Sequence, residues 1–247
     1  MITLHHGDYR DVLPELGQFK MIFADPPDNI GLKYNGFEDK IEDYQSFLIN
    51  LVCFMVDHAK ISWLSFNAKW YTEVCSAIDQ LGIQSDHDCR FMVQTFTFGS
   101  NQRKDFTNGF RPLLRLMRPN ASTYPKKVYV PSWRQEHGDK RAAKGGKMPD
   151  DVWDFPRVTG NSAQRREWSP TQLHEGLYKR AIDFSCRKGD KICDLFAGSG
   201  TMARVAGETH NVHLIELSNP TIDNLYKEHG PCDLHCYSQS SFCPSCD

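Results

Sequence analysis

A short loop near the N-terminus combines two carboxylates with two prolines. It follows an apolar stretch and reads Phe23-Ala24-Asp25-Pro26-Pro27-Asp28-Asn29. Each proline fixes its own backbone φ and lacks an N–H, and Pro26 also favours extended geometry at Asp25. The loop is therefore expected to be stiff and to present a carboxylate and several carbonyl oxygens beyond a strand end. These acceptors suit an amino group, which offers two N–H donors, so the sequence indicates chemistry on an exocyclic amine.

A second segment, far along the chain, combines an acid with a glycine-rich turn. It reads Asp194-Leu195-Phe196-Ala197-Gly198-Ser199-Gly200-Thr201. A strand that runs into such a turn and then into a helix lets the backbone approach a ligand closely. Glu216 ends the next predicted strand, where an acid can accept hydrogen bonds from two ribose hydroxyls, and Asp194 suits a cationic amino-acid end. The turn also fits the loose G-x-G-x-x-G/A pattern of dinucleotide sites, and an ordinary tight turn is a further alternative.

The C-terminal tail contains a third cluster of reactive side chains. Four of the nine cysteines lie there, namely Cys232, Cys236, Cys243 and Cys246. Four thiolates can hold zinc tetrahedrally, and the final C-x-x-C has ligand spacing. A flexible tail with incidental thiols and a disulfide are the alternatives. The other five cysteines are scattered through apolar stretches, which is typical of reduced core residues in an intracellular protein.

Strands alternate with helices along the chain, which predicts an α/β sheet. The predicted strands cover residues 1–5, 20–24, 61–66, 89–98, 113–118, 190–194 and 212–217, and the predicted helices cover residues 41–59, 68–81, 171–186 and 201–208. The proline loop and the glycine turn each follow a predicted strand. Residues 119–168 show little periodicity and many Pro and Gly residues, so they are expected to form a long insertion that depends on the main domain or on a ligand for its order.

Positive charge is concentrated in one segment. Residues 103–147 contain twelve Lys or Arg residues and three acids, a net charge of +9, whereas the whole chain carries −2. Aromatic residues interleave with the basic ones, a pattern that suits a phosphate backbone with exposed bases. A solvated surface loop is the alternative. The expected phosphate contacts are Arg134, Lys140, Arg141, Lys144 and Lys147.

Length and composition exclude other classes of protein. A chain of 247 residues can bury one substantial core, with a smaller appended module. No apolar run of about 18 residues is present, so no membrane span is expected. The N-terminus lacks the basic and apolar regions of a signal peptide. A cytoplasmic location is therefore expected.

Three segments, in this order, resemble the β group of S-adenosylmethionine-dependent DNA amino-methyltransferases, which modify adenine N6 or cytosine N4. They are the proline loop at Asp25, the segment Ser169-Pro170-Thr171-Gln172 and the glycine turn at Asp194. The resemblance covers residues 1–67 and 150–226. It implies a doubly wound, mainly parallel α/β sheet of the class I methyltransferase type, with one reversed strand and a basic insertion. It also implies S-adenosylmethionine as cofactor, DNA as partner, and DNA methylation of the kind found in restriction–modification.

The same resemblance divides most of the chain into three parts, and the tail is a fourth. Residues 1–118 would form the catalytic half of the methyltransferase domain, and residues 169–228 its cofactor-binding half. Residues 119–168 would be the basic target-recognition insertion. The cysteine spacing, independently of the resemblance, marks residues 229–247 as a Cys-rich tail, with zinc as its candidate metal.

Carried onto this sequence, the resemblance implies roles for individual residues. Asp25 would hold the target amino group and draw its proton, with the carbonyl of Pro26 accepting a second N–H, while Pro27, Asp28 and Asn29 complete the catalytic motif. The implied cofactor-binding residues are Asp8, Asp25, Thr171, Gln172, Asp194, Phe196, Gly198, Gly200, Thr201 and Glu216. For Asp8, Thr171 and Gln172, a helix cap or a surface polar role is an equal alternative.

Asp28 departs from the family pattern, which usually has an aromatic residue at this position. That ring stacks on the extruded base, a contact that contributes about 1–3 kcal/mol in comparable settings. Asp28 cannot stack, although it can accept a hydrogen bond, and two adjacent carboxylates raise each other's pKa. Tyr34 or Phe37 is a candidate for the missing ring.

The acid before the two prolines favours adenine N6 as the target, because cytosine-N4 relatives more often have serine there. Three alternatives remain from the sequence. They are a cytosine-N4 methyltransferase, a catalytically weakened relative that binds DNA without modifying it, and a nucleotide-dependent oxidoreductase that uses the glycine turn.

Overall fold

A computed structural model describes residues 1–34, 37–96, 104–142, 144–230 and 232–237 of the chain, without the side chains of residues 33–38. Its main sheet contains β1 (Ile2–His6), β2 (Phe19–Ala24), β5 (Ala59–Ser65), β6 (Asp88–Thr95), β7 (Phe110–Met117), β8 (Val152–Asp154), β9 (Lys191–Asp194), β10 (Asn211–Glu216) and β11 (Asp233–Cys236). Their order across the sheet is β11-β1-β10-β9-β2-β5-β7-β6-β8. A second, two-stranded sheet pairs β3 (Lys33–Tyr34) with β4 (Phe37–Glu38).

Most neighbouring strands of the main sheet are parallel. β7 is antiparallel to both of its neighbours, β5 and β6, so it is the reversed strand. The central strands are almost continuously apolar, as in the β2 sequence FKMIFA, because both faces of a doubly wound sheet are covered. These features confirm the predicted fold class, a doubly wound and mainly parallel α/β sheet.

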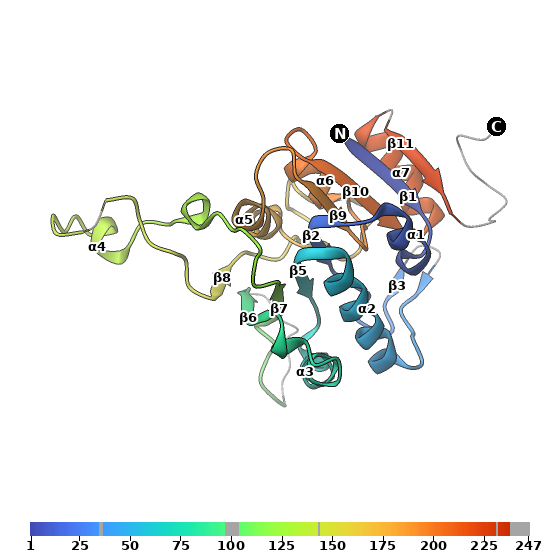
Figure 1. Ribbon diagram of the computed structural model, residues 1–247, viewed down its shortest axis with the longest axis horizontal. Coiled ribbons are helices and arrows are strands. Elements are labelled where there is room, and N and C mark those ends of the chain that lie inside the picture. The colour runs from blue at the N-terminus through green and yellow to red at the C-terminus, as the bar shows by residue number, and fades with distance from the viewer. Residues whose placement is uncertain (35–36, 97–103, 143, 231, 238–247) are drawn as a thin grey trace.

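Helices cover both faces of the sheet (Figure 1). One core cluster joins the sheet to α1 (Tyr9–Leu16), α2 (Tyr44–His58) and α3 (Tyr71–Gln80), and the other joins it to α5 (Glu175–Ser185), α6 (Thr201–Ala206) and α7 (Asn219–His229). Successive residues of β2 alternate between the two clusters, with Ile22 in the first and Met21 and Phe23 in the second. This alternation follows from the two-residue period of a strand. It also fixes the carboxyl end of β2, and therefore the proline loop, between the two helical layers.

The predicted helices are present as α2, α3, α5 and α6, each shorter than expected. α3 is preceded by a 3-10 turn at Ala68–Trp70, and further 3-10 turns lie at Ile83–Ser85 and Pro125–Val128. Three helices were not predicted: α1 contains Pro14, α7 has few apolar residues, and α4 (Trp133–Glu136) has only four residues. Among the described residues, no helix has both the length and the apolar character needed to cross a membrane.

The basic insertion extends away from the sheet and carries the short helix α4 (Trp133–Glu136), at the left of Figure 1. Its last part returns to the sheet, where β8 pairs with β6 and forms the edge of the sheet. Trp153 on β8 is buried and packs on Trp63 of β5, with ring centroids 5.5 Å apart. Trp153 therefore anchors the end of the insertion to the sheet, while the division into four parts stays a prediction.

Candidate functional site

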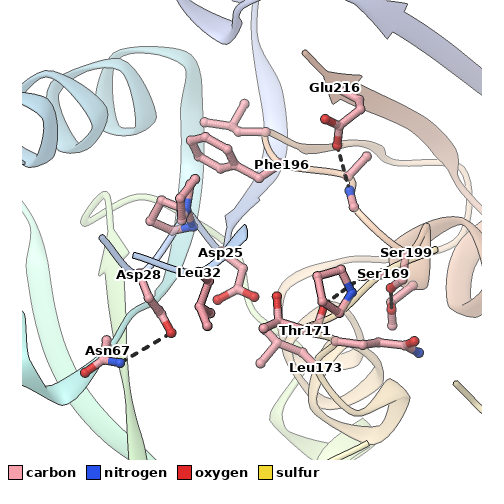
Figure 2. Close-up of a pocket in the computed structure, with 18 of the residues that line it drawn as sticks. Asp25, Asp28, Leu32, Asn67, Ser169, Thr171, Leu173, Phe196, Ser199 and Glu216 are labelled. Carbon is pink, nitrogen blue, oxygen red and sulfur yellow. Dashed lines mark hydrogen bonds between the residues drawn. The ribbon is translucent and has the colours of Figure 1, made fainter. Parts of the chain in front are cut away.

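A cavity of about 1060 Å³ lies at the carboxyl ends of β2, β9 and β10. Because these strands are parallel, the segments that follow them meet at one edge of the sheet. The cavity lining includes Asp25 after β2, Phe196 after β9 and Glu216 at the end of β10 (Figure 2). The fold thus brings together the proline loop and the glycine turn, which are far apart in the sequence.

Two aromatic side chains fix the proline loop through its backbone. The Tyr44 hydroxyl donates to the Pro27 carbonyl at 2.5 Å, and the Trp70 indole N–H donates to the Asp28 carbonyl at 2.6 Å. Pro26 lines the cavity, and its carbonyl accepts no hydrogen bond from the described part of the chain. This carbonyl therefore keeps its capacity to accept a donor from a ligand.

Asp25 and Asp28 share the guanidinium of Arg111, which lies near the start of β7. Arg111 Nη2 lies 2.6 Å from Asp25 Oδ1, and Nη1 lies 2.9 Å from Asp28 Oδ1. The third nitrogen, Nε, donates to Ser65 Oγ at 2.7 Å. Asn67 Nδ2 donates to the second oxygen of Asp28 at 3.3 Å (Figure 2). This role of Arg111 was not predicted, because the only signal in the sequence is a basic residue in a basic segment.

The electrostatic environment of Asp25 differs from that of a surface carboxylate. Burial raises the pKa of Asp25, the charge of Arg111 lowers it, and the neighbouring Asp28 raises it again; the net direction is upward. The side chains of Arg111 and Asp28 are themselves only 17% and 14% exposed. A raised carboxyl pKa makes the carboxylate a stronger base, so Asp25 is suited to accept a proton from a bound group.

Glu216 is held by the backbone at the opposite side of the cavity. Its two carboxylate oxygens accept the N–H of Gly198 at 3.0 Å and the N–H of Ser218 at 2.8 Å (Figure 2). A carboxylate has about four lone-pair sites, so acceptor capacity remains for hydroxyl donors in the cavity. Gly198 lines the cavity with φ +46°, a left-handed conformation that favours glycine.

The two glycines of the turn have different surroundings. Thr201 lines the cavity, as Gly198 does, whereas Gly200 does not belong to the lining. A Cβ on Gly200 would lie 2.6 Å from Leu225 Cδ2 of α7, and its φ is +73°. Gly200 therefore permits close packing of the turn on α7, and direct contact with a cofactor stays a prediction for this residue.

Asp194 is fully buried behind the cavity wall and is not part of the lining. Its carboxyl group accepts hydrogen bonds from the Tyr178 hydroxyl at 3.0 Å and from the Phe196 N–H at 3.2 Å. Burial raises the pKa of Asp194 to about 8. Tyr178 and Phe196 do line the cavity, so Asp194 fixes two residues of the wall, and its predicted contact with a cofactor is indirect in this structure.

Asp8 and Asn29 have local structural roles. Asp8 lines the cavity, but it also caps α1 by accepting the Arg10 N–H at 2.9 Å and pairs with the Arg10 guanidinium at 2.6 Å. Asn29, predicted within the catalytic motif, is outside the lining, and its side chain exchanges two hydrogen bonds with the backbone of Ile41. Asn29 therefore closes the loop that follows Asp28.

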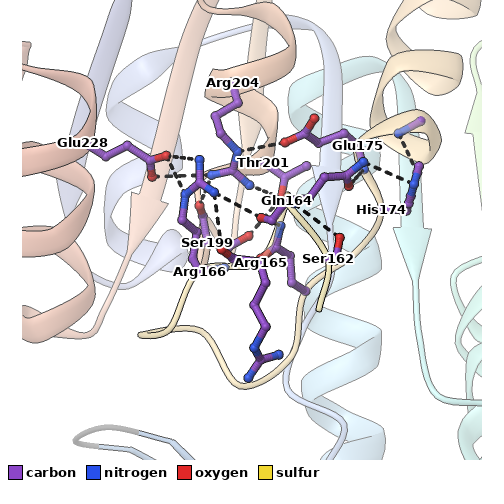
Figure 3. Close-up of polar contacts among 12 residues, drawn as sticks. Ser162, Gln164, Arg165, Arg166, His174, Glu175, Ser199, Thr201, Arg204 and Glu228 are labelled. Carbon is purple, nitrogen blue, oxygen red and sulfur yellow. Dashed lines mark hydrogen bonds and ion pairs between the residues drawn. The ribbon is translucent and has the colours of Figure 1, made fainter. Parts of the chain in front are cut away.

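Thr171 and Gln172 both line the cavity, but the amide of Gln172 is bound within its own loop. Its oxygen accepts the Arg166 N–H at 3.1 Å and its nitrogen donates to the Gln164 carbonyl at 2.7 Å. The Arg166 side chain pairs with Glu228 on α7 at 2.5 Å (Figure 3). These contacts make residues 164–172 a braced wall of the cavity. Figure 2 shows Thr171 and Asp25 directed into the same space.

The zinc prediction finds no support in the described part of the chain. Cys232 precedes β11 and Cys236 is its last residue, while Cys243 and Cys246 fall outside the described residues. The residues that the structure describes include no group of three or more His, Cys, Asp or Glu side chains able to hold a metal. The side chains of Tyr34 and Phe37, the candidates for a stacking ring, also fall outside the described residues.

Solved structures with a similar fold include methyltransferases. The M1.HpyAVI–SAM complex superimposes with a TM-score of 0.63 at 14% identity, over 94% of this chain and all of that one. PvuII DNA methyltransferase, described as cytosine-N4-specific, superimposes with a TM-score of 0.67 at 13% identity, over 90% of this chain and 83% of that one. At such identities the likeness supports the fold alone.

Sequence relatives identify the family. DNA adenine methyltransferase YhdJ of Escherichia coli K12 is 30% identical over 83% of this chain and 74% of its own length. Type II methyltransferase M.ScaI of Streptomyces caespitosus is 26% identical over 83% of this chain and 73% of its own length. The family model for N6 and N4 methyltransferases, described as DNA methylase, matches residues 19–226. The chain therefore belongs to the N6/N4 DNA methylase family of amino-methyltransferases.

Proposed function

We propose that this protein transfers a methyl group from S-adenosylmethionine to the exocyclic amino group of a base in DNA, with adenine N6 as the target. The observation that carries the proposal is the position of Asp25. This largely buried carboxylate adjoins the carbonyl of Pro26, which accepts no hydrogen bond from the described residues, in a cavity whose other side is the glycine turn.

The residues of the cavity fit S-adenosylmethionine by their chemistry. Glu216 offers fixed carboxylate oxygens for ribose hydroxyls, and Gly198 lets the backbone come close to a ligand. The ring of Phe196 supplies an apolar surface, and the buried carboxyl group of Asp194, with a pKa of about 8, lies behind it. A cationic group bound nearby would favour the charged form of this carboxyl group. Bound there, S-adenosylmethionine supplies an electrophilic methyl group on a positively charged sulfur.

Asp25 and Pro26 would prepare the amine for reaction. An amino group conjugated with a base ring is a poor nucleophile, so its orientation matters as much as removal of its proton. The Pro26 carbonyl would accept one N–H and an oxygen of Asp25 the other, which would take the nitrogen lone pair out of conjugation with the ring and direct it towards the methyl group. Asp25 would then take up the proton that the nitrogen loses. No covalent bond between the enzyme and the base is needed.

Two observations support adenine rather than cytosine. An aspartate precedes the two prolines, and the relative at 30% identity is named a DNA adenine methyltransferase. The likeness to the cytosine-N4-specific PvuII enzyme concerns the fold at 13% identity. A cytosine-N4 activity is the second candidate.

The basic insertion is the proposed DNA interface. Tyr129 and Trp133 expose 40% and 68% of their surface there, among Lys and Arg side chains. Exposed rings among cations can contact bases while the cations contact phosphates. The target base lies inside a duplex and would have to be flipped, or be single-stranded already, to reach Asp25.

Methyl transfer from labelled S-adenosylmethionine to mixed-sequence DNA, duplex and single-stranded, tests the proposal. The DNA is digested and its nucleosides are separated. Label in N6-methyladenine is the expected result, and label in N4-methylcytosine would replace adenine by cytosine as the target. Binding of both DNA and cofactor without any transfer would overturn the catalytic proposal and identify a DNA-binding relative that has lost the reaction.

A further inference from the structure

Arg111 holds the two carboxylates of the proline loop, and the proposed reaction gives it no role. Each nitrogen of its guanidinium contacts a different group: Nη2 contacts Asp25, Nη1 contacts Asp28 and Nε donates to Ser65. The three groups come from the proline loop and from β5. A guanidinium held at three points has a fixed plane, because its donors form a rigid fork.

We propose that Arg111 is a positioning residue for Asp25, and that Asp28 is the counter-ion that prevents Arg111 from neutralising Asp25. This inference rests on the proposed function, because it concerns the charge of the carboxylate that would act on the target amine.

The charge balance at the site supports this assignment. Two carboxylates and one guanidinium leave one net negative charge among three side chains that are 14–21% exposed. Asp25 paired alone with an arginine would form a neutral pair and a weak base. Asp25 beside Asp28 without the arginine would repel it, and one of the two would bind a proton. The arrangement of two acids and one arginine keeps Asp25 charged yet basic.

The geometry leaves Asp25 able to bind a substrate. Arg111 contacts Oδ1 of Asp25, and Ser65 also hydrogen-bonds this carboxylate. A carboxylate has about four lone-pair sites, so acceptor capacity remains towards the cavity that Asp25 lines. Asp28 is fixed more firmly, since Trp70 holds its carbonyl and Asn67 its carboxylate. Asp28 is therefore placed as a stationary counter-ion, and Asp25 as the carboxylate that exchanges partners.

Other titratable groups also face this pair. Tyr44 of α2 interacts electrostatically with Asp28, Asp25 and Arg111, while Tyr178 of α5 and Asp194 of β9 interact with Asp25. Burial raises the pKa of both tyrosines, so they stay neutral in the range where carboxylates titrate. All three groups are present in every variant below, and differences between variants therefore report on Arg111 and Asp28.

The test compares the acidic limb of the pH dependence of kcat in three variants. Arg111→Gln removes the cation, so the acidic limb is expected to move to higher pH. Once the midpoint of this limb exceeds the assay pH, kcat is expected to fall about tenfold for each further pH unit. Asp28→Asn removes the anion, so the limb is expected to move to lower pH and kcat on the plateau to fall. The double variant is expected to lie between the two single ones.

Arg115→Gln is the matched control. Arg115 lies on the same strand, is buried, and pairs with one acid, Asp88, but it does not line the cavity. Its replacement is expected to change thermal unfolding without moving the acidic limb. If Arg111→Gln does not fold, Asp28→Asn is still expected to move the limb to lower pH, and the double variant to lie at higher pH than Asp28→Asn. Limbs that coincide with that of the unaltered protein in all folded variants would overturn the proposal.

A second measurement separates this inference from the proposed function. The carboxyl carbons of the free protein are labelled at aspartate and titrated by carbon-13 NMR, with Asp25→Asn used to assign the Asp25 signal. The titration of Asp25 is expected to move up in Arg111→Gln and down in Asp28→Asn, whether or not any DNA is methylated. If the Asp25 titration shifts in the variants but the unaltered protein methylates no DNA, the proposed function alone is overturned. If the unaltered protein methylates DNA but the Asp25 titration does not shift in the variants, this inference alone is overturned.

Discussion

The proline loop and the glycine turn each place a buried carboxylate at the same cavity, but they stabilise it differently. Asp25 shares the guanidinium of Arg111 with Asp28 and lines the cavity. Asp194 contacts a hydroxyl and a backbone N–H, from Tyr178 and Phe196, and lies behind the cavity wall. One acid is paired with a cation, and the other depends on neutral donors.

The difference indicates what each segment does. Neutral donors stabilise a buried charge less than a cation does, and burial accordingly raises the pKa of Asp194 to about 8. Asp194 is thus suited to hold the wall and to favour a cationic group nearby. Asp25, with its charge kept by Arg111, is suited to exchange a hydrogen bond and a proton with a substrate.

The largest expected effect is on catalysis and concerns Asp25. Asp25→Ala removes both the acceptor for the target amine and the proton acceptor, so methyl transfer is expected to fall by about 10²–10⁴-fold. Cofactor binding, measured by calorimetry, is expected to persist because Glu216 and the glycine turn are unchanged. Asp79→Ala, at an exposed position of α3, is the control and is expected to keep full activity. Full transfer by Asp25→Ala would refute the role given to the proline loop.

The second prediction concerns Asp194 and the pH dependence of stability. Its pKa of about 8 in the fold lies above the ordinary aspartate value of 3.8, so the folded state holds this proton more tightly than the unfolded state. The contribution of Asp194 to the free energy of unfolding is therefore greatest at low pH. It is lost as the pH rises, by about 1.4 kcal/mol for each unit between the two pKa values.

Asp194→Asn removes this pH-dependent loss of stability, while the amide oxygen can still accept hydrogen bonds from Tyr178 and Phe196. Relative to the unaltered protein, the variant is expected to gain stability steadily from pH 4 to pH 8 in denaturant unfolding. Asp79→Asn supplies the comparison for an exposed aspartate. A stability difference between Asp194→Asn and the unaltered protein that does not change with pH would show that the fold does not raise the pKa of Asp194.

The sequence predicted the parts of this site that depend on local pattern. The proline loop and the glycine turn each follow a strand and carry candidate residues within a few positions, and Glu216 ends the strand after the glycine turn. Asp25, Phe196 and Glu216 could therefore be chosen as site residues before the structure. The partners of the carboxylates could not. Arg111 lies 86 residues from Asp25, and which of many basic residues pairs with it depends on the register of β7 against β5.

Hydrogen bonds from side chains to the backbone of their own loops could not be predicted either. Asn29 and Gln172 have side chains suited to binding a ligand, yet both form hydrogen bonds with nearby backbone groups. Helix α1 escaped prediction because Pro14 interrupts its pattern. The fold class was predictable because apolar strands and helical periods recur along the whole chain, whereas each of these details depends on one contact.

The smallest expected effect distinguishes two glycines of the turn by stability. Gly200→Ala places a Cβ 2.6 Å from Leu225 Cδ2 at a φ of +73°, so overpacking is expected to lower the free energy of unfolding by about 1–3 kcal/mol. Gly82→Ala is the matched control, with φ +62° and nothing within 4 Å of the added Cβ. The stability loss of Gly82→Ala measures the backbone strain alone, on the order of 1–2 kcal/mol. The additional loss in Gly200→Ala then measures the steric clash with Leu225.

Gly198→Ala completes this comparison, because Gly198 lines the cavity and its added Cβ would meet the Phe196 carbonyl only at 3.7 Å. Its stability is expected to match that of Gly82→Ala, while its affinity for S-adenosylmethionine falls. Gly200→Ala is expected to show the reverse balance, with a larger loss of stability than of affinity. If Gly198→Ala and Gly200→Ala lose equal stability and equal affinity for S-adenosylmethionine, the two glycines do not have separate roles. A position in the cavity lining would then not distinguish a glycine needed for binding from one needed for packing.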